Sequence, residues 1–226
     1  DAILEIGPGQ GAITRLIAPH VQSVLTIEKD KDLIEGLRSE FIGTNVEIIN
    51  KDFLAWEMND LKSQVKVIGN IPYNISTPII EKLIAHRSLV TQAYLTVQLE
   101  FGQRLAANPG SKDYGSLSCF IQFYAGVKLL FPIKSSAFRP APKVDSCFVR
   151  LDFQDPPVFK PCNDILMFKF IRTVFTQRRK NILNSASSMV DKTKMASILK
   201  DLSIPSDARP ETLSLQNFVD ISHRLV

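Results

Sequence analysis

Hydrophobic positions in the first two thirds of the chain alternate between short apolar runs and segments with helical periodicity. The apolar runs that we predict to be strands are Ala2–Ile6, Val24–Ile27, Val46–Ile49, Val65–Ile68, Ala93–Val97 and Ser146–Phe153. The helices predicted between them are Ala12–Ile17, Asp32–Phe41, Thr77–Ala85 and Gln98–Ala107. Strands that alternate with helices predict an α/β fold with a doubly wound, mostly parallel sheet.

The pattern changes after the last predicted strand. Gln154–Pro157 has the composition of a linker, and everything beyond it has helical periodicity. The helices predicted there are Ile165–Phe175, with Asn163 or Asp164 as N-cap, Lys192–Leu202 and Ser214–Leu225. We therefore predict an α/β domain over residues 1–155 and a small all-helical domain over residues 156–226.

Composition narrows the class of protein. The chain has 226 residues, of which 45% are hydrophobic and 22% charged, as in ordinary globular proteins. No apolar run is long enough to cross a bilayer, so we expect no membrane partner. The three cysteines show no paired spacing. This argues against a disulfide framework or a zinc site, so we expect no metal and a reducing, cytoplasmic location.

The charge is unevenly distributed along the chain. Residues 157–226 hold 11 Lys and Arg against 6 Asp and Glu, whereas residues 1–156 hold 16 against 17. A basic helical end on a nearly neutral body suggests that the end meets a polyanion. Within it, Arg178, Arg179 and Lys180 form a run with few acids at pairing distance. We predict that this run contacts an RNA backbone; the alternative is a solvated helical surface.

A glycine-rich turn after the first strand predicts a cofactor site. Gly7, Gly9 and Gly11 allow a tight turn and a close backbone approach where the next helix begins. Glu28 ends the second strand, where an acid commonly binds a ribose diol. With Glu5 before the first glycine, the pattern is typical of S-adenosylmethionine sites. The alternatives are a dinucleotide site or simple packing of strand on helix.

Asp52 and Phe53 follow the third predicted strand and extend this site. The carboxylate can accept a hydrogen bond from an adenine amine, and the ring can pack on the base. The alternative for Asp52 is a loop acid or a helix cap. Because the carboxyl ends of parallel strands meet at one edge of a sheet, we expect these residues to lie near the glycine turn.

The loop Asn70-Ile71-Pro72-Tyr73 follows the fourth predicted strand, at the same edge. The amine of adenine is a poor nucleophile because its lone pair is delocalised into the ring. Acceptors at its N–H groups, the Asn70 side-chain oxygen and a main-chain carbonyl near Pro72, would favour a pyramidal nitrogen. Tyr73 would stack on the base. Positioning and local electrostatics would then supply most of the catalysis.

A second ring for the base is predicted in the segment Ser136–Ser146. Its prolines hold the chain extended, and Phe138 can project from it. Arg139 and Lys143 are available to phosphates. The alternative is a rigid loop with a buried phenylalanine.

Several stretches together resemble the KsgA-type rRNA adenine N6-dimethyltransferases. They are Glu5–Gly9, Asn70–Pro78, Tyr114–Ser118, Phe138–Ser146 and Gln177–Lys180. The resemblance implies a class I methyltransferase domain followed by a small helical domain, with S-adenosylmethionine as methyl donor. It implies dimethylation of two adjacent adenines in a hairpin near the 3′ end of small-subunit rRNA. The implied partner is a late assembly intermediate of the small subunit, and we expect a monomer.

The resemblance also assigns residues to the two halves of the site. The implied cofactor contacts are Gly7, Glu28, Asp52 and Asn70, and the implied acceptor site is Asn70, Pro72, Tyr73 and Phe138. Family members carry a basic segment with a Phe-x-Gln-Asn-Phe-Leu-like motif before the first strand, and it does not occur in this sequence. We therefore expect residues 1–226 alone to bind the cofactor weakly or not at all and to be inactive.

Three other functions compete with this one. A resistance-type dimethyltransferase of large-subunit rRNA would share the acceptor loop, but the Gln177–Lys180 run favours the small-subunit enzyme. A DNA adenine methyltransferase usually has proline where Ile71 stands. An organellar assembly or transcription factor could keep the fold without the chemistry, although the cofactor positions are intact.

Overall fold

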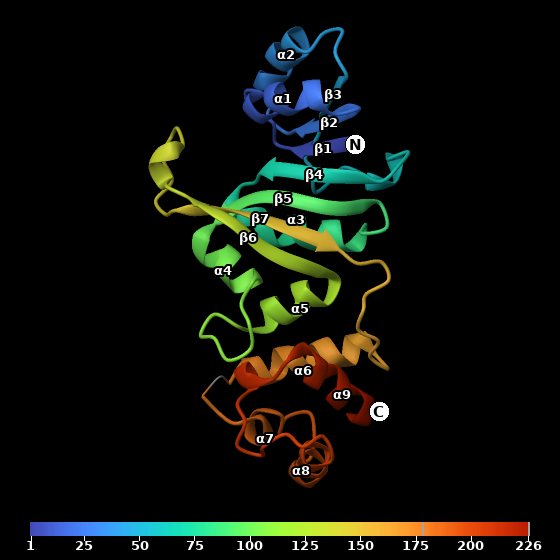
Figure 1. Ribbon diagram of the computed structural model, residues 1–226, viewed down its shortest axis with the longest axis vertical. Coiled ribbons are helices and arrows are strands. Elements are labelled where there is room, and N and C mark those ends of the chain that lie inside the picture. Colours follow the sequence, from blue (N-terminus) through green and yellow to red (C-terminus); the bar gives the residue numbers. More distant parts are fainter. Residues whose placement is uncertain (178, 226) are drawn as a thin grey trace. The chain divides into compact units, whose positions relative to one another are not determined.

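The computed structural model describes residues 1–177 and 179–225 (Figure 1). Its strands form one sheet in the order β3-β2-β1-β4-β5-β7-β6. They are β1 (Ala2–Ile6), β2 (Ser23–Glu28), β3 (Val46–Asn50), β4 (Val65–Asn70), β5 (Val90–Gln98), β6 (Ala125–Ile133) and β7 (Ser146–Phe153). The first five strands pair in parallel, and β7 runs antiparallel to β5. The predicted mostly parallel sheet is therefore confirmed.

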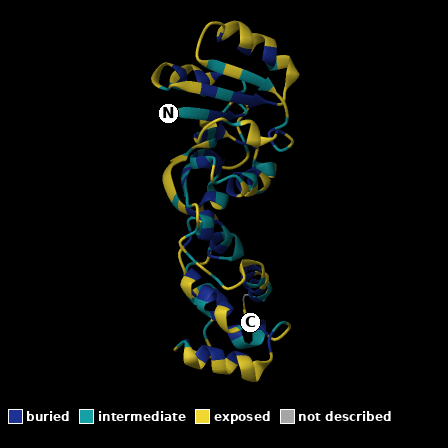
Figure 2. Ribbon diagram, turned by 90° about the vertical axis from the view of Figure 1, so that its right-hand side faces the viewer, coloured by how far each residue is buried: buried dark blue, intermediate teal, exposed yellow. Residues whose placement is uncertain are grey.

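Helices connect the parallel strands and make up the end of the chain. The α-helices are α1 (Ala12–Ile17), α2 (Lys31–Glu40), α3 (Ser76–Ala85), α4 (Leu99–Leu105), α5 (Ser116–Tyr124), α6 (Asp164–Phe175), α7 (Ile182–Ser185), α8 (Lys192–Asp201) and α9 (Leu215–Leu225). The short 3₁₀ helices are η1 (Ala18–His20), η2 (Met58–Asp60), η3 (Tyr73–Ile75), η4 (Ser135–Ala137) and η5 (Pro210–Thr212). In Figure 2 the helical ribbons carry both buried and exposed residues, as expected of amphipathic helices.

Local capping fixes where several helices begin. The Asn163 side chain accepts a hydrogen bond from the Leu166 amide at 2.9 Å, so Asn163 rather than Asp164 is the N-cap of α6. Asp30 caps α2 in the same way by accepting from the Asp32 amide at 3.0 Å. These caps satisfy amide groups that have no partner inside the helix.

The chain divides into two compact units. The first comprises Asp1–Gly102 and Gly126–Asp155, and the second comprises Gln103–Ala125 and the chain from Pro156 onward. The predicted domains, residues 1–155 and 156–226, stay a prediction, and they would leave α5 in the first domain. The structure groups α5 with the C-terminal helices.

Apolar packing explains the place of α5. Its Phe123 is 3% exposed and lies edge-to-face with Phe168 of α6, with ring centroids 5.2 Å apart. Cys119 of α5 belongs to the same buried cluster, together with Phe170 and Phe218. Because α5 buries its apolar side in this core, the second unit is built from two separate parts of the chain.

Among residues 1–177 and 179–225, no helix combines the length and the apolar character needed to span a bilayer. The same residues contain no cluster of three or more His, Cys, Asp or Glu side chains suited to a metal ion.

Candidate active site

Four neighbouring strands of the first unit end at one edge of the sheet. β3, β2, β1 and β4 are adjacent and parallel, so the residues that follow them lie side by side. Three strand spacings separate the outer two, about 14 Å in all. The chain order reverses between β1 and β4, and open α/β sheets bind ligands at such a point. The predicted glycine turn, Glu28, Asp52 and the Asn70 loop are therefore brought together.

The glycine turn after β1 is bonded to the end of β2. Gly7 and Gly9 have φ values of 68° and 59°, a region that residues with a side chain rarely adopt. The Gly9 amide donates to Glu28 Oε2 at 3.0 Å, and the Asp30 amide donates to Oε1 at 2.8 Å. Glu28 is 7% exposed, so one buried carboxylate holds both strand ends.

The geometry of this turn fits a nucleoside ligand. A carboxylate offers about four acceptor positions, so Glu28 retains capacity for hydroxyl donors such as those of a ribose. A Cβ atom built on Gly7 or Gly9 would meet no atom within 4 Å, so open space borders the turn. The main chain of the turn is therefore open to close approach by a ligand.

Glu5 supports the same turn from inside the fold. It is 1% exposed, and its Oε2 accepts a hydrogen bond from Thr14 Oγ1 of α1 at 2.5 Å. Burial raises the pKa of the Glu5 carboxyl above its usual range. A residue enclosed in this way acts on a ligand mainly through the turn that it holds, not as an exposed contact.

Asp52 lies one strand further along the edge. Its Oδ2 pairs with Lys29 Nζ at 2.9 Å, and its Oδ1 accepts from the Leu54 amide at 2.9 Å. The hydrogen bond from Lys29 holds the pKa of this carboxyl below its usual range. Asp52 is therefore ionised at neutral pH and can accept a hydrogen bond from a base.

Phe53 differs from the expectation of an open stacking ring. It is 5% exposed, its ring packs near Trp56 with centroids 6.4 Å apart, and Lys82 Nζ lies 5.1 Å from its centroid. The ring is thus part of the core, and the predicted packing of its face on a cofactor does not match this environment.

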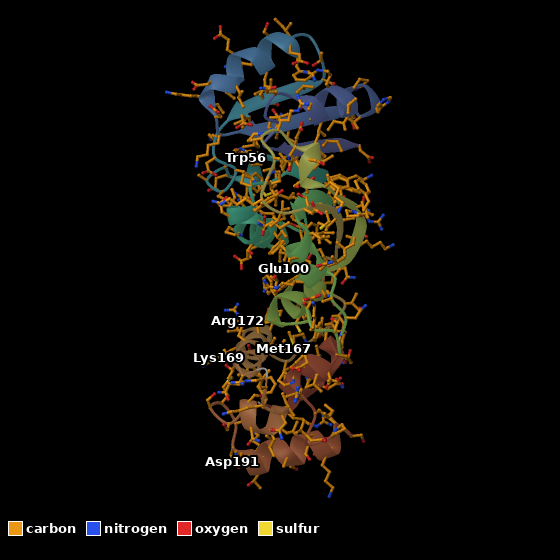
Figure 3. All side chains as sticks on the ribbon, turned by 90° about the vertical axis from the view of Figure 1, so that its left-hand side faces the viewer. Trp56, Glu100, Met167, Lys169, Arg172 and Asp191 are labelled. Atoms are coloured by element: carbon orange, nitrogen blue, oxygen red, sulfur yellow. The ribbon has the colours of Figure 1, made fainter. Side chains whose placement is uncertain are left out.

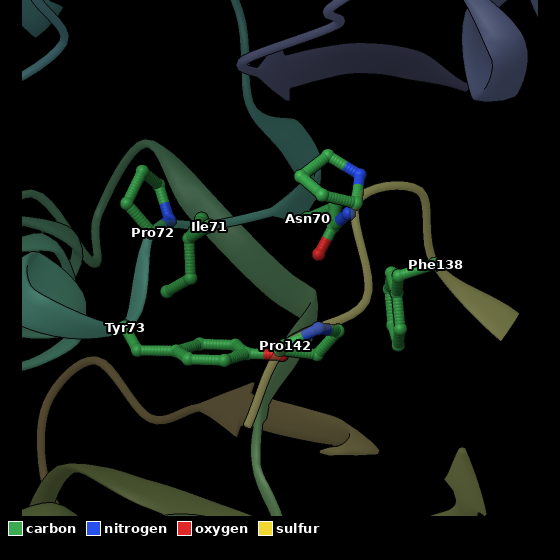
Figure 4. Close-up of a pocket in the computed structure, with 7 residues that line it drawn as sticks. Asn70, Ile71, Pro72, Tyr73, Phe138 and Pro142 are labelled. Carbon is green, nitrogen blue, oxygen red and sulfur yellow. The ribbon is translucent and has the colours of Figure 1, made fainter. Parts of the chain in front are cut away.

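The acceptor loop lines a cavity of about 240 Å³ (Figure 4). Its walls are Asn70, Ile71, Pro72, Tyr73, Phe138, Pro140 and Pro142. Ile71 is 1% exposed and anchors the loop, whereas Asn70 is exposed. In Figure 4 the Asn70 oxygen and the rings of Tyr73 and Phe138 face the same space. The sequence-predicted acceptor residues therefore line a single pocket.

A glycine allows the acceptor loop to lie this close to the glycine turn. A Cβ atom on Gly69 would lie 2.9 Å from the Ile6 carbonyl oxygen of β1, closer than real contacts allow. Any larger residue at position 69 would push β4 away from β1, and Asn70 with it.

The two rings of the pocket are held differently. The Tyr73 hydroxyl is 2.6 Å from Ser146 Oγ, at the start of β7, which fixes the ring from its far end. Phe138 is half-buried and follows η4, whose first residue, Ser135, donates its amide to Asp145 Oδ1 at 2.9 Å. In Figure 4 the two ring planes cross rather than face each other. A base stacked on both rings would require Phe138, which has no polar group to tether it, to turn.

The predicted RNA-binding cations fall in two places. Arg139 and Lys143 are exposed on the segment that carries Phe138. Arg179 and Lys180 are exposed in the second unit, where they line a cavity of about 550 Å³ with Phe175, Thr176 and Gln177. Arg178 lies outside the described residues.

Arg172 belongs to the same basic region of the second unit. It is exposed on α6 and projects on the side of Lys169, three residues earlier in the helix (Figure 3). The helix thus adds two cations to those that follow it.

Some residues of the site were not predicted from the sequence. Ser146 forms a hydrogen bond with the Tyr73 hydroxyl, and Thr14 donates one to Glu5. Asp145 accepts one from the Ser135 amide, in the turn before Phe138. Asp145 and Ser146 stand together at the start of a predicted strand, a polar pair whose position could have indicated a loop anchor. Lys82 gives no such signal in the sequence.

Comparison with known proteins identifies the family. The family described as "Ribosomal RNA adenine dimethylase" matches residues 1–226. The chain is 37% identical over 236 residues to Ribosomal RNA small subunit methyltransferase A of Alkaliphilus oremlandii, with 100% of this chain and 82% of that protein covered. It is 36% identical to the protein of the same name from Fusobacterium nucleatum, with 98% and 85% covered.

Solved structures agree with the fold. A dimethyladenosine transferase from Plasmodium falciparum superposes with a TM-score of 0.83 at 28% identity, with 98% of this chain and 88% of that chain covered. The 23S rRNA methyltransferase ErmE has a TM-score of 0.80 at 24% identity, with 99% and 90% covered, and so supports the fold alone. The predicted class I methyltransferase fold is confirmed. The chain belongs to the ribosomal RNA adenine dimethylase family.

Proposed function

We propose that this protein transfers methyl groups from S-adenosylmethionine to the N6 amines of two adjacent adenosines in a hairpin near the 3′ end of small-subunit rRNA. The observation that carries this proposal is the pocket in which Asn70, Tyr73 and Phe138 face one space, at the same sheet edge as the strand ends of Glu28 and Asp52. Relatives at 36–37% identity carry the small-subunit name, which favours that substrate over large-subunit rRNA.

The residues along the edge suit the parts of the cofactor. Glu28 would accept hydrogen bonds from the ribose hydroxyls, and Asp52 from the adenine amine. The positive φ values of Gly7 and Gly9 give the turn the close backbone approach that the ligand needs. S-adenosylmethionine supplies a methyl group already activated on a sulfonium centre.

The acceptor loop would orient the target amine. Asn70 Oδ1 would accept a hydrogen bond from one N–H group of this amine. The Pro72 carbonyl already accepts from the Ile75 amide at 3.2 Å and from Ser76 Oγ at 3.3 Å. We therefore assign the second acceptor to the neighbouring Ile71 carbonyl. Two acceptors on one amine hold its lone pair out of the ring plane and aim it at the methyl group.

Stacking would compensate for extrusion of the base from RNA. Unstacking a base costs a few kcal/mol. Contact with an aromatic ring returns about 1–3 kcal/mol per base. Tyr73, fixed by Ser146, would receive the base, and Phe138 would turn to cover its second face.

The basic run of the second unit would bind the rRNA backbone outside the reacting base. Replacement of Arg178, Arg179 and Lys180 by alanine is expected to weaken binding of small subunits. It should also reduce the steepness of the salt dependence by about one unit for every phosphate that the variant no longer touches. The measurement is the affinity for small subunits over a range of salt concentrations.

Two exposed lysines of α8 provide the control for that experiment. Lys192 and Lys200 lie in the same unit, and their replacement by alanine removes charge elsewhere on its surface. The control should leave the slope nearly unchanged. An identical slope for the wild type and the triple variant would refute the RNA contact.

One labelling experiment tests the proposed activity. The full-length protein is supplied with methyl-labelled S-adenosylmethionine and with unmethylated small subunits, large subunits or DNA. Label is expected in small-subunit rRNA as N6,N6-dimethyladenosine at two adjacent positions, and label on large subunits alone would overturn the proposal. We also propose that the enzyme acts in the cytoplasm, as a monomer, on a late assembly intermediate. Sedimentation of the protein alone and with such particles tests the monomer and the partner.

A further inference from the structure

A single lysine on α3 binds the loop that follows β3. Lys82 Nζ donates to the main-chain oxygens of Phe53 at 2.7 Å and Leu54 at 3.1 Å, and also to that of Trp56. The same ammonium lies 5.1 Å from the centroid of the Phe53 ring. One side chain therefore contacts most of the loop that begins at Asp52.

The bonding capacity of Lys82 is fully used by this loop. An ammonium group has three N–H donors and no acceptor, and all three donors reach main-chain oxygens within four residues. Lys82 is only partly exposed, and burial lowers its pKa, while the nearby acids Glu57 and Asp52 act in the opposite direction. The side chain is thus enclosed by the loop and does not serve as a surface charge.

The position of Lys82 links the two halves of the site. α3 begins at Ser76, directly after the acceptor loop and η3, and Lys82 lies about two turns further along it. Its acceptors lie next to Asp52, the predicted partner of the cofactor adenine. One helix therefore carries the acceptor loop at its start and the adenine loop on its side.

We propose that Lys82 is a positioning residue for cofactor binding, which fixes residues 53–56 so that Asp52 meets the adenine in the correct orientation. This inference rests on the proposed function, because it takes Asp52 as the adenine contact. The carboxylate of Asp52 is otherwise held by Lys29, whose side chain is 76% exposed, and by the Leu54 amide. The Lys82 bonds join this loop to the helix that follows the acceptor loop.

The test compares three variants of the full-length protein. Lys82→Met removes the donors and keeps the length of the side chain, and Lys82→Arg keeps the charge in a planar group of different reach. Lys66→Met is the matched control, because Lys66 pairs with Asp1 at 2.7 Å on β4, away from the loop. Affinity for S-adenosylhomocysteine is measured by calorimetry, and kcat is measured at saturating cofactor.

A positioning role predicts a specific pattern. Lys82→Met should weaken binding of S-adenosylhomocysteine by about five- to tenfold, near the low end of typical coupling between sites. Lys82→Arg should weaken it less, and Lys66→Met should not. The KM for the cofactor should rise while kcat at saturation stays within about twofold, because only uniform binding is lost. Hydrogen exchange should quicken at the amides of residues 54–56 but not across the rest of the unit.

A double variant examines whether Lys82 acts through Asp52. In an Asp52→Ala background the further loss of affinity from Lys82→Met should shrink to less than about half of its value, since coupled residues are not additive. An equal loss in both backgrounds, or wild-type affinity in Lys82→Met, would overturn the proposal. If Lys82→Met does not fold, Lys82→Gln, which also removes the ammonium group, takes its place, and unchanged affinity in that variant overturns the proposal. Failure of the wild-type protein to bind S-adenosylhomocysteine would instead refute the proposed function.

Discussion

The two halves of the sheet edge are built from different chemistry. On the cofactor side, Glu5 and Glu28 are buried carboxylates, 1% and 7% exposed, and both are hydrogen-bonded within the fold. On the acceptor side, the pocket walls are proline, isoleucine and aromatic residues around one exposed amide, Asn70. Hydrogen bonds to carboxylates fix the first half, whereas packing of prolines and aromatic rings fixes the second.

This difference suits the ligands that we propose for the two halves. A nucleoside cofactor offers hydroxyl and amine donors, so acceptors fixed in advance bind it without reorganisation. The Gly9 amide already holds one Glu28 oxygen in place. An adenine taken from RNA offers flat ring faces and one exocyclic amine, so two aromatic rings and one amide are the groups that we expect to receive it. Phe138, whose ring has no hydrogen-bonding group, would have to turn to stack on the second face of such a base (Figure 4).

Among the described walls of the acceptor pocket, Asn70 supplies the one side-chain amide. Asn70→Ala removes the side-chain acceptor that would orient the amine, and it leaves the rings intact. We expect kcat to fall by about 10²–10³-fold, as on removal of one preorganised polar group from an active site. Affinity for S-adenosylhomocysteine should change far less. Single-turnover methylation of unmethylated small subunits gives the rate, and calorimetry gives the affinity.

Asn59→Ala is the control, because Asn59 is an exposed asparagine of the same unit on η2. It should retain wild-type activity. A kcat for Asn70→Ala within about threefold of wild type would contradict the proposal that the Asn70 amide orients the target amine while the aromatic rings bind the base.

Phe138→Ala tests the aromatic part of the acceptor half. Loss of one stacking ring should weaken the apparent affinity for RNA by about 5- to 150-fold, from 1–3 kcal/mol per stacked base. Cofactor affinity should be unaffected, because Phe138 lies on the segment between β6 and β7. The KM for small subunits is the measurement.

Phe131→Ala provides a matched phenylalanine outside the pocket. Phe131 lies on β6, is 54% exposed and packs on Phe148 with centroids 5.4 Å apart. Equal losses of RNA affinity in the two variants would show that the effect of Phe138→Ala is not stacking in the pocket.

The sequence predicted which residues lie at the sheet edge better than it predicted how far each side chain is buried. Apolar runs followed by Gly7, Glu28, Asp52 and Asn70 were sufficient to predict one sheet edge, because parallel strands bring their ends together. The sequence did not reveal that Phe53 points into the core, since the residue after a strand-end acid can face either way. The 5% exposure of Phe53 comes from Trp56 and Lys82, three and 29 positions away.

Two further features depend on contacts between distant parts of the chain. Lys82 binds main-chain oxygens, which every residue has, so no sequence pattern marks its partners. The apolar side of α5 is readable from periodicity, but periodicity does not say which core it enters. The pairing of Phe123 with Phe168 decides that, and it joins residues that are 45 positions apart. Local patterns predicted most of the helices and strands, and tertiary packing determined which core each of them enters.

Glu5→Gln tests how much the buried Glu5 carboxylate lowers the stability of the unliganded protein. We expect the smallest effect of all from this variant. Burial raises the pKa of Glu5 above 4.5, so the folded protein binds a proton more readily than the unfolded chain. The contribution of protonated Glu5 to stability is therefore present below pH 4.5 and is lost as the pH rises through the raised value. Gln has the same shape without the charge and can still accept from Thr14.

We expect Glu5→Gln to raise the Tm of the unliganded protein by about 1–3 °C at pH 7. The difference should nearly vanish at pH 4, where the side chain is mostly protonated in both states. Differential scanning calorimetry at both pH values measures it, with the exposed Glu57→Gln as control. A lower Tm for Glu5→Gln at pH 7 would contradict the argument, because it would mean that the ionised carboxylate stabilises the fold. A higher Tm together with a lower affinity for S-adenosylhomocysteine would show that the Glu5 carboxylate favours ligand binding and destabilises the unliganded protein. In the part of the chain that the structure describes, the acceptor half contains no buried carboxylate of this kind among its pocket walls.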